Sequence, residues 1–198
     1  MKIGPKYKIA RRLGSPVFEK TQTQKFALRE GKKTRGRTKP KTDFGLQMNE
    51  KQKARMFYAV SEKQFAKYVS KSLEKSTIAP TVNLYSMLES RLDNVIWRAG
   101  LAPTHLAARQ RSAHGHFVVN GKRTYTPSFA LKNGDKIEIR EGSKNSPMFK
   151  ELEEKESQIP TWLDWDNKTK TLVVKATPVK TDNEIFFDLG QVIEFYQR

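Results

Sequence analysis

The chain has no cysteine among its 198 residues, so disulfides and zinc sites built on thiolates are excluded. Acidic residues are scarce too: 21 Asp and Glu stand against 38 Lys and Arg, a formal net charge of +17. An excess of this size bears on partners rather than on the fold, and it favours a polyanion as the partner.

Long apolar runs are also missing. No segment reaches the roughly 18 consecutive apolar residues of a membrane-spanning helix. The opening MKIGPKYKIARRLG lacks the apolar core of a secretory signal. A basic, acid-poor start is compatible with an organellar targeting peptide, although Gly4 and Pro5 would interrupt an amphipathic helix there. We therefore expect a cytoplasmic protein with no membrane partner.

The positive charge is concentrated at the beginning. Residues 1–42 carry 14 Lys or Arg and 2 acids, whereas residues 141–198 carry 8 Lys or Arg and 11 acids. Few large apolar residues follow Phe26 and Leu28 in this first segment, so little core is expected there. We interpret it as a basic arm that becomes ordered against phosphates, with a solubilising tail as the alternative.

Helices are predicted on both sides of residue 61. One is expected over about residues 46–60, with Thr42 or Asp43 as its cap. Ser61, with Gln64 three residues later, has the pattern of a capping box that begins a second helix. Residues 76–84 are expected to form a loop.

Residues 88–140 form the most informative stretch. The segment LESRLDNVIWRAG predicts one helix that ends at Gly100, and a short second helix follows. Asn120 and Gly121 predict a tight hairpin turn, and the alternating segment KIEI predicts a third strand. About fifty residues are too few to hold both a core and a deep catalytic pocket. They do suit a rigid binding module.

The remainder predicts a short charged helix over residues 147–156, a hairpin over residues 162–174 and a C-terminal helix that packs on residues 43–75. The expected fold class is α+β: a mostly helical first domain with an inserted small RNA-binding module of two helices and short antiparallel strands. The predicted domains are a basic arm (1–42), a helical domain (43–86 plus 182–198), the module (88–148) and its extension (149–181).

No metal site and no cofactor are predicted. The pair His114-Gly115-His116 lacks the spacing and the companion ligands of a zinc site. His114 follows the second helix of the module, where its ring would either cap helix carbonyls or contact RNA.

No catalytic residue is predicted either. Asp93 lies in an Arg-Leu-Asp tripeptide similar to the context of the catalytic aspartate of pseudouridine synthases. Here the sequence continues as a helix, so we expect Asp93 on the helix surface, able to pair with Arg98 or to hold a neighbouring residue. A nucleophile elbow and a phosphate-cradling glycine loop are both missing from the sequence. An enzyme is therefore not expected.

Basic residues gather in two predicted clusters. In the module, Arg91 and Arg98 are expected on one helix face, and His105 and Arg109 recur one turn apart on the next helix. The second cluster is expected on the helix over residues 46–60. Together with the arm, these clusters favour the backbone and minor groove of folded RNA.

These segments together resemble the family of bacterial small-subunit ribosomal protein four. The likeness covers nearly the whole chain, and it is carried by GPKYKIARRLG, TDFGLQMNEKQKARMFYAV, EKQF, LESRLDNVIWRAGLAPTHLAARQ, VNGK, NGD, PTWL and VIEFY. Their order and spacing are more specific than any one of them. Some relatives bind zinc through cysteines in the arm, which this chain cannot do.

The resemblance implies a protein that binds small-subunit rRNA and acts early in subunit assembly. It implies proximity to ribosomal protein five and a place near the mRNA entrance that affects decoding accuracy. Carried over by position, it implies rRNA contacts at Arg11, Arg12, Lys51, Lys53, Arg55, Arg91, Arg109, Gln110, His114 and Lys122. The residue patterns add Arg35, Arg37, Gln52, Tyr58, Arg98, His105, His116, Asn120 and Arg123.

Two alternatives share the same module. An RNA-modifying enzyme would use it as a guide, but such proteins attach a large catalytic domain for which 198 residues leave no room. A stress-induced ribosome-associated factor is the other alternative, and substoichiometric occupancy of purified subunits would favour it.

Overall fold

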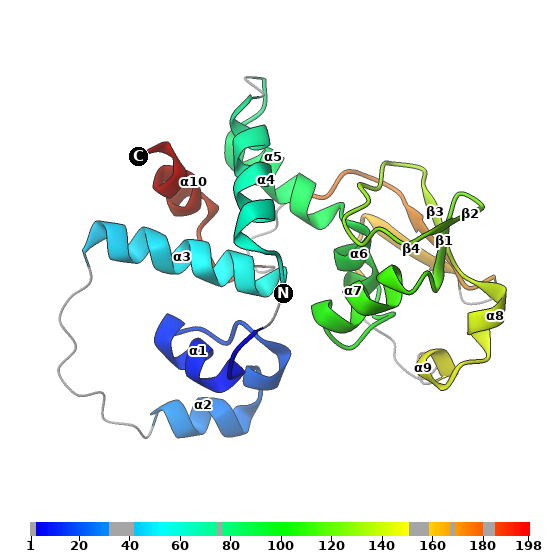
Figure 1. Ribbon diagram of the computed structural model, residues 1–198, viewed down its shortest axis with the longest axis horizontal. Coiled ribbons are helices and arrows are strands. Elements are labelled where there is room, and N and C mark those ends of the chain that lie inside the picture. Colours follow the sequence, from blue (N-terminus) through cyan, green and yellow to red (C-terminus); the bar gives the residue numbers. More distant parts are fainter. Residues whose placement is uncertain (1–2, 32–41, 75–76, 151–158, 167–168, 180–184) are drawn as a thin grey trace. The chain divides into compact units, whose positions relative to one another are not determined.

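The chain forms two compact units in the computed structural model, which describes residues 3–31, 42–74, 77–150, 159–166, 169–179 and 185–198 (Figure 1). Unit 1 comprises Met1–Leu84 with Thr181–Arg198, and unit 2 comprises Tyr85–Lys180. Unit 2 is therefore inserted into unit 1 along the chain. The predicted fold class, a helical first domain with an inserted module of helices and antiparallel strands, is confirmed.

The described part of the arm belongs to unit 1 and contains several buried apolar residues. It contains α1 (Lys6–Leu13), a 3₁₀ turn (Glu19–Thr21) and α2 (Gln24–Gly31). More of this segment is buried than expected, because α1 ends in a left-handed turn at Gly14 and contacts both the 3₁₀ turn and α3 (Asp43–Phe57). The residues buried in this way are Ala10, Leu13, Val17 and Phe18.

The two predicted helices follow, with the expected caps. In α3 (Asp43–Phe57), the Thr42 hydroxyl accepts the Gly45 N–H at 3.3 Å. Before α4 (Glu62–Glu74), the Ser61 hydroxyl accepts the Gln64 N–H at 3.4 Å. Each bond satisfies an N–H that has no acceptor within its own helix.

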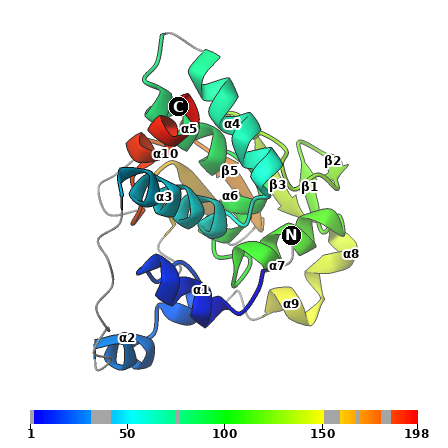
Figure 2. The same cartoon turned by 60° about the vertical axis from the view of Figure 1, so that its left-hand side comes forward.

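The C-terminal helix α10 (Leu189–Gln197) lies beside α3, as predicted, and the two views in Figures 1 and 2 agree on this. The rings of Phe44 and Phe195 are 5.4 Å apart between centroids. The Gln47 side chain donates to Glu194 at 3.0 Å. The last residues of the chain thus complete the core begun by residues 43–75.

The region between the units differs from the prediction. The supposed loop at 76–84 is mostly α5 (Pro80–Glu89), which begins with proline at a position where no N–H is needed. The single helix expected over 88–100 is broken, because α6 (Leu92–Arg98) begins only after Ser90 and Arg91.

The break is caused by the segment that follows the hairpin. The N–H groups of Leu92 and Asp93, which begin α6, donate to the carbonyls of Phe129 and Pro127 at 2.9 and 3.0 Å. The Leu131 N–H donates back to Ser90 at 2.8 Å. Backbone groups from a distant part of the chain therefore replace the helical bonds at this point.

Unit 2 continues with α7 (His105–Ala113), β1 (Phe117–Val119), β2 (Lys122–Thr124) and β3 (Lys136–Ile139). The predicted hairpin turn is confirmed: Asn120 and Gly121 have φ of 49° and 78°. Positive φ at both central residues gives the turn whose twist matches that of the two strands.

The rest of unit 2 joins the same sheet. After α8 (Glu141–Lys144) and α9 (Pro147–Lys150), the predicted hairpin is formed by β4 (Leu163–Asp166) and β5 (Thr171–Val174). The antiparallel order is β2-β1-β3-β5-β4, with β5 paired to β3. The segment predicted as an extension is thus continuous with the module, whereas residues 151–156 of the predicted helix lie outside the described residues.

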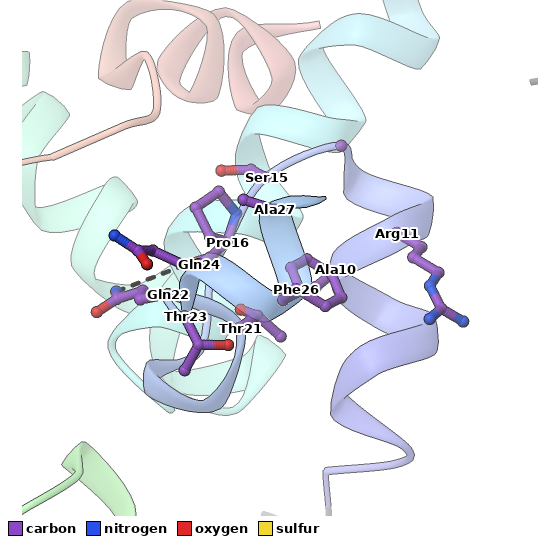
Figure 3. Close-up of a pocket in the computed structure, with 11 residues that line it drawn as sticks. Ala10, Arg11, Ser15, Pro16, Thr21, Gln22, Thr23, Gln24, Phe26 and Ala27 are labelled. Carbon is purple, nitrogen blue, oxygen red and sulfur yellow. Dashed lines mark hydrogen bonds between the residues drawn. The ribbon is translucent and has the colours of Figure 1, made fainter. Parts of the chain in front are cut away.

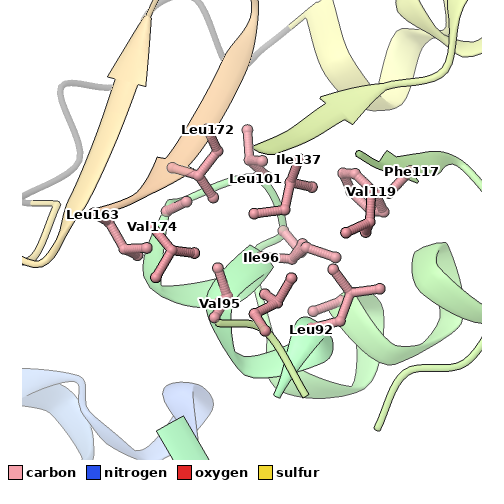
Figure 4. Close-up of a cluster of buried hydrophobic side chains, with 14 of the residues drawn as sticks. Leu92, Val95, Ile96, Leu101, Phe117, Val119, Ile137, Leu163, Leu172 and Val174 are labelled. Atoms are coloured by element: carbon pink, nitrogen blue, oxygen red, sulfur yellow. The ribbon is translucent and has the colours of Figure 1, made fainter. Parts of the chain in front are cut away.

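One face of this sheet packs against α6. Leu92, Val95 and Ile96 point from the helix toward Ile137 and Leu172 of the sheet (Figure 4). All five side chains are at most 1% exposed. This core holds the module's surface elements in place.

Prediction: Leu172→Ala destabilises unit 2 by about 2–5 kcal/mol, because it leaves a cavity between α6 and the sheet. All three tryptophans, Trp97, Trp162 and Trp165, lie in unit 2, so their fluorescence during urea denaturation reports on that unit. Val173→Ala, at a half-buried neighbouring position, is the control and should cost less. Equal losses for the two variants would contradict this account of the core.

Candidate nucleic-acid interface

A cationic surface forms in unit 2 where α7 meets the β1–β2 hairpin. Thr104 caps α7 by accepting the Ala107 N–H at 3.1 Å, and the helix ends at His114. Gly115, with φ of 69°, turns the chain directly into β1. The helix and the hairpin are therefore joined by a turn of only a few residues.

Arg123 fixes the hairpin to this turn. Its Nε donates to the Gly115 carbonyl at 2.9 Å, and its Nη2 donates to the His114 carbonyl at 3.3 Å. Both acceptors are carbonyls at the end of α7, where a positive charge is also favoured by the helix dipole. Two parts of the predicted site are thereby brought together.

Other predicted residues share this part of unit 2. Gln110, His114, Asn120 and Lys122 are exposed, and Arg109 is half-buried on α7. The Asn120 side chain also donates to Asp135 at 2.8 Å and accepts the Lys136 N–H, so it supports the turn. We define the module surface as Arg109, Gln110, His114, Lys122 and Arg123.

His116 lies at the edge of the module surface and is partly engaged. Its Nδ1 is 2.9 Å from the Ser143 hydroxyl, and its ring is stacked 6.1 Å from that of His114. Burial lowers the pKa of His116 below its usual value, and His114, Arg140, Arg111 and Arg123 lower it further. The lowered pKa favours the neutral form of His116, so we do not count it among the cations of the module surface.

Arg91 and Asp93 are buried, although both were expected at the surface. Arg91 is 1% exposed, and its Nε and Nη2 donate to the two Asp93 carboxylate oxygens at 2.9 and 2.5 Å. The prediction of Asp93 on a helix surface is wrong, since Asp93 is 4% exposed, and of its two expected partners it holds a neighbour, Arg91, rather than Arg98. With both oxygens of Asp93 held by a buried arginine, neither residue presents its charge to a ligand.

Arg98 and His105 join a second buried network. Arg98 donates to both oxygens of the fully buried Glu89, at 2.9 and 2.8 Å. His105 is 7% exposed, lies 3.0 Å from the Asn94 side-chain oxygen and stacks on Trp97 at 3.9 Å. The interpretation of these two residues as surface contacts is corrected, because Arg98 joins α6 to the end of α5 and His105 joins α7 to α6.

The predicted cluster on α3 is largely used within unit 1. Lys51 is 7% exposed, binds Glu62 at 2.9 Å and lies 4.3 Å from the centre of the Phe195 ring. Lys53 pairs with Glu50 at 2.5 Å. These charges are compensated internally, so Lys51 holds α10 and α4 against α3 rather than facing outward.

Three further members of this cluster are also engaged. Arg55 bonds to Gln52 at 2.7 Å and lies 3.3 Å from Glu62. Tyr58 is 2% exposed and packs against Phe57 and Phe187, so it offers no ring face for stacking on RNA.

Glu62 is the common partner of Lys51, Arg55 and Tyr196. Burial alone would raise the pKa of its carboxyl group, but the hydrogen bonds from Lys51 and Tyr196 and the charges of Lys51 and Arg55 bring that pKa below its usual value. Tyr196 donates to Glu62 at 2.8 Å. The pKa of Tyr196 is raised well above its usual value, first by burial and then by this bond.

A stripe of lysines on α4 was missed from the sequence. Lys63, Lys67 and Lys71 are all exposed, and their spacing of four residues places them on one side of the helix. The signal is present in the segment EKQFAKYVSKSLEK, where lysines recur every four residues opposite the apolar face of the helix. This stripe is an additional cationic surface of unit 1.

In the arm, Arg11 and Arg12 are exposed on α1, as a contact role requires. A pocket of about 380 Å³ lies beside them, lined by residues of α1, the following turn and α2 (Figure 3). The Arg11 guanidinium lies 6.0 Å from the centre of the Phe26 ring, which is part of the lining. Arg35 and Arg37 lie outside the described residues.

The described part of the chain offers neither a metal centre nor a membrane-spanning helix. No group of three or more His, Asp or Glu residues there is arranged to hold a metal ion. Among the helices in those same ranges, none is long and apolar enough to cross a membrane.

Comparisons with known proteins give a consistent result. The family model "Ribosomal protein S4/S9 N-terminal domain" matches residues 1–89, and the model "S4 domain" matches residues 90–137. Small ribosomal subunit protein uS4 of Sulfurihydrogenibium sp. (strain YO3AOP1) is 40% identical over 200 residues, which cover 98% of this chain and 97% of the relative.

Two further relatives have the same name, small ribosomal subunit protein uS4. That of Persephonella marina is 38% identical, over 98% of this chain and 97% of its own length. That of Acetivibrio thermocellus is 38% identical, over 98% of each chain.

Prediction: Asp93→Ala destabilises unit 2 by about 3–5 kcal/mol, because it leaves the Arg91 charge buried without its partner. The control is Asp164→Ala, since Asp164 and Lys175 form a pair whose side chains are 55% and 54% exposed. Such a pair is worth at most about 1 kcal/mol. Urea denaturation followed by circular dichroism measures both, and a loss for Asp93→Ala no larger than that of the control would contradict the prediction.

Prediction: Glu62→Gln lowers the stability of unit 1 in a pH-dependent manner. The folded pKa of Glu62 lies below its ordinary value of 4.5, so its contribution is fully present above that value and is lost as the pH falls through the folded pKa. Because the Glu62 side chain is 47% exposed, we expect only about 0.5–1 kcal/mol at pH 7.

The measurement is the free energy of unfolding from circular dichroism at pH 7 and at pH 3. Glu141→Gln serves as the control, since that side chain is 86% exposed. A difference between wild type and Glu62→Gln that stays constant down to pH 3 would show that the carboxylate charge has no part in it.

Proposed function

The chain belongs to the ribosomal protein uS4 family, and from this premise we propose that it binds small-subunit rRNA directly through the module surface and the arm. The family consists of structural, non-enzymatic constituents of the small ribosomal subunit with RNA-binding domains. The place of action is accordingly the cytoplasmic ribosome.

One observation carries the proposal for direct binding. The segment from His105 to Tyr125 contains four Lys or Arg residues and no acid, and Arg123 holds its helix and hairpin together. A rigid cationic surface of this kind suits the phosphate backbone, because binding releases counterions without a cost for ordering loops.

The finer role that we propose follows from this surface and from the family. A protein whose module is folded before it meets RNA can bind early and help to nucleate subunit assembly. We further propose proximity to ribosomal protein five and to mRNA near its entrance, where the protein helps to set translational accuracy. Family membership supports these points.

Prediction: Arg109→Ala weakens binding to naked small-subunit rRNA and leaves the fold intact. Arg109 is only half-buried, so its loss removes a phosphate contact rather than a core residue. The slope of log K against log salt should fall in magnitude by about 0.7–0.9, the contribution of one neutralised phosphate. Filter binding at four salt concentrations measures this slope.

Lys175→Ala, at an exposed position of the same unit, is the matched control and should leave the slope unchanged. The proposal for direct rRNA binding fails if the affinity of the wild-type protein hardly changes between low and physiological salt. If only the Arg109 variant behaves like wild type, that residue leaves the contact set while the proposal stands. Footprinting should show one compact protected junction.

A further inference from the structure

Tyr125 is an exposed aromatic residue directly after β2. Its side chain is 53% exposed, so a large part of the ring is open to solvent. The Arg123 guanidinium lies over the ring, 4.6 Å from its centroid. Since Arg123 also donates to the Gly115 and His114 carbonyls, the ring rests on a cation that is fixed in position.

Gly115 permits this close packing. A Cβ atom added at Gly115 would lie 2.6 Å from Cε1 of Tyr125 and 2.7 Å from Nε of Arg123. Any other residue would therefore push the ring and the guanidinium away from the turn. The α7–β1 turn, Arg123 and Tyr125 form one packed layer, which we call the Tyr125 platform.

The surroundings of the platform select an anionic partner. Residues 105–125 contain no Asp or Glu. Arg123 lies over the ring itself, and Lys122, which precedes Arg123 in β2, is exposed. A flat aromatic face beside a fixed cation and an exposed lysine matches the two parts of a nucleotide, since a base stacks on the ring while its phosphates meet the cations.

We propose that the Tyr125 platform stacks an unpaired nucleobase of the bound RNA. The proposal rests on the proposed function, because it names one nucleotide contact within the module surface. Arg123 already covers part of the ring and polarises it. A base would stack on the part of the ring that is exposed. A duplex offers no free base face except at its end, so the partner is a bulged, looped or terminal nucleotide.

The test compares Tyr125→Phe, Tyr125→Leu and wild type in filter binding to naked small-subunit rRNA. Tyr125→Phe keeps the ring and should bind within about twofold of wild type. Tyr125→Leu keeps apolar volume without a stacking face, and its affinity should fall about 5- to 100-fold, the usual effect of losing one base–aromatic stack. Because no phosphate contact is lost, the salt slope should stay unchanged.

Val179→Ala is the control for an exposed apolar residue of the same unit, since Val179 is 68% exposed, and it should have no effect. In addition, ultraviolet irradiation of the wild-type complex should crosslink the peptide that contains Tyr125 to a single nucleotide, identified by mass spectrometry. Tyr125→Leu should lose this crosslink.

The outcomes separate the two proposals. If the wild-type protein binds in a salt-dependent manner and Tyr125→Leu keeps full affinity, the stacking proposal is overturned, and the proposal of direct rRNA binding stands. Absence of salt-dependent binding by wild type overturns the proposed function itself. A loss of affinity in Tyr125→Leu that comes with a smaller salt slope would identify a phosphate contact, and stacking would then be rejected.

Discussion

The structure of unit 2 depends on the buried charges at the junction of α5 and α6. Glu89, Arg91 and Asp93 are all less than 5% exposed, and burying an ion is tolerable only when its partners are in place. Arg91 finds both oxygens of Asp93, and Glu89 accepts two bonds from Arg98. These pairs lie where α5 ends and α6 begins. The segment that supplies the backbone bonds to α6, residues 127–131, meets the chain at the same junction.

A consequence is that the cations of the chain divide into two classes. Lys51, Arg91 and Arg98 are bound to carboxylates inside their units, where they determine how helices pack. The cations of the module surface, of the α4 stripe and of α1 are exposed or half-buried. Net charge counts both classes equally, although only the second attracts a polyanion. The large positive charge therefore produces a long-range attraction to RNA. Specificity depends on the few cations whose positions the fold determines.

Much of the fold was predictable because its signals are local. The caps at Thr42 and Ser61, the turn at Asn120 and the apolar C-terminal helix each depend on residues within a few positions of one another. The helix break at Arg91 was not predictable in this way. It depends on carbonyls about forty residues away, and the sequence around it has good helical periodicity. The burial of apolar residues in the arm was underestimated for a similar reason, since it arises only when α1 contacts the 3₁₀ turn and α3.

For the candidate site, the sequence by itself determined the kind of partner: a cysteine-free chain with this excess of Lys and Arg, and with the segments of a ribosomal protein family, is a binder of RNA. Composition and motif order suffice for that conclusion because the phosphate backbone carries the same negative charge whatever the RNA sequence. Which cations face outward was decided only by the tertiary structure. Arg91 and Arg123 are equally basic in the sequence, yet one is sealed against Asp93 and the other supports an exposed tyrosine. The physical reason is desolvation, since a buried charge must be matched by a partner, and only the fold decides which of the charged side chains are buried.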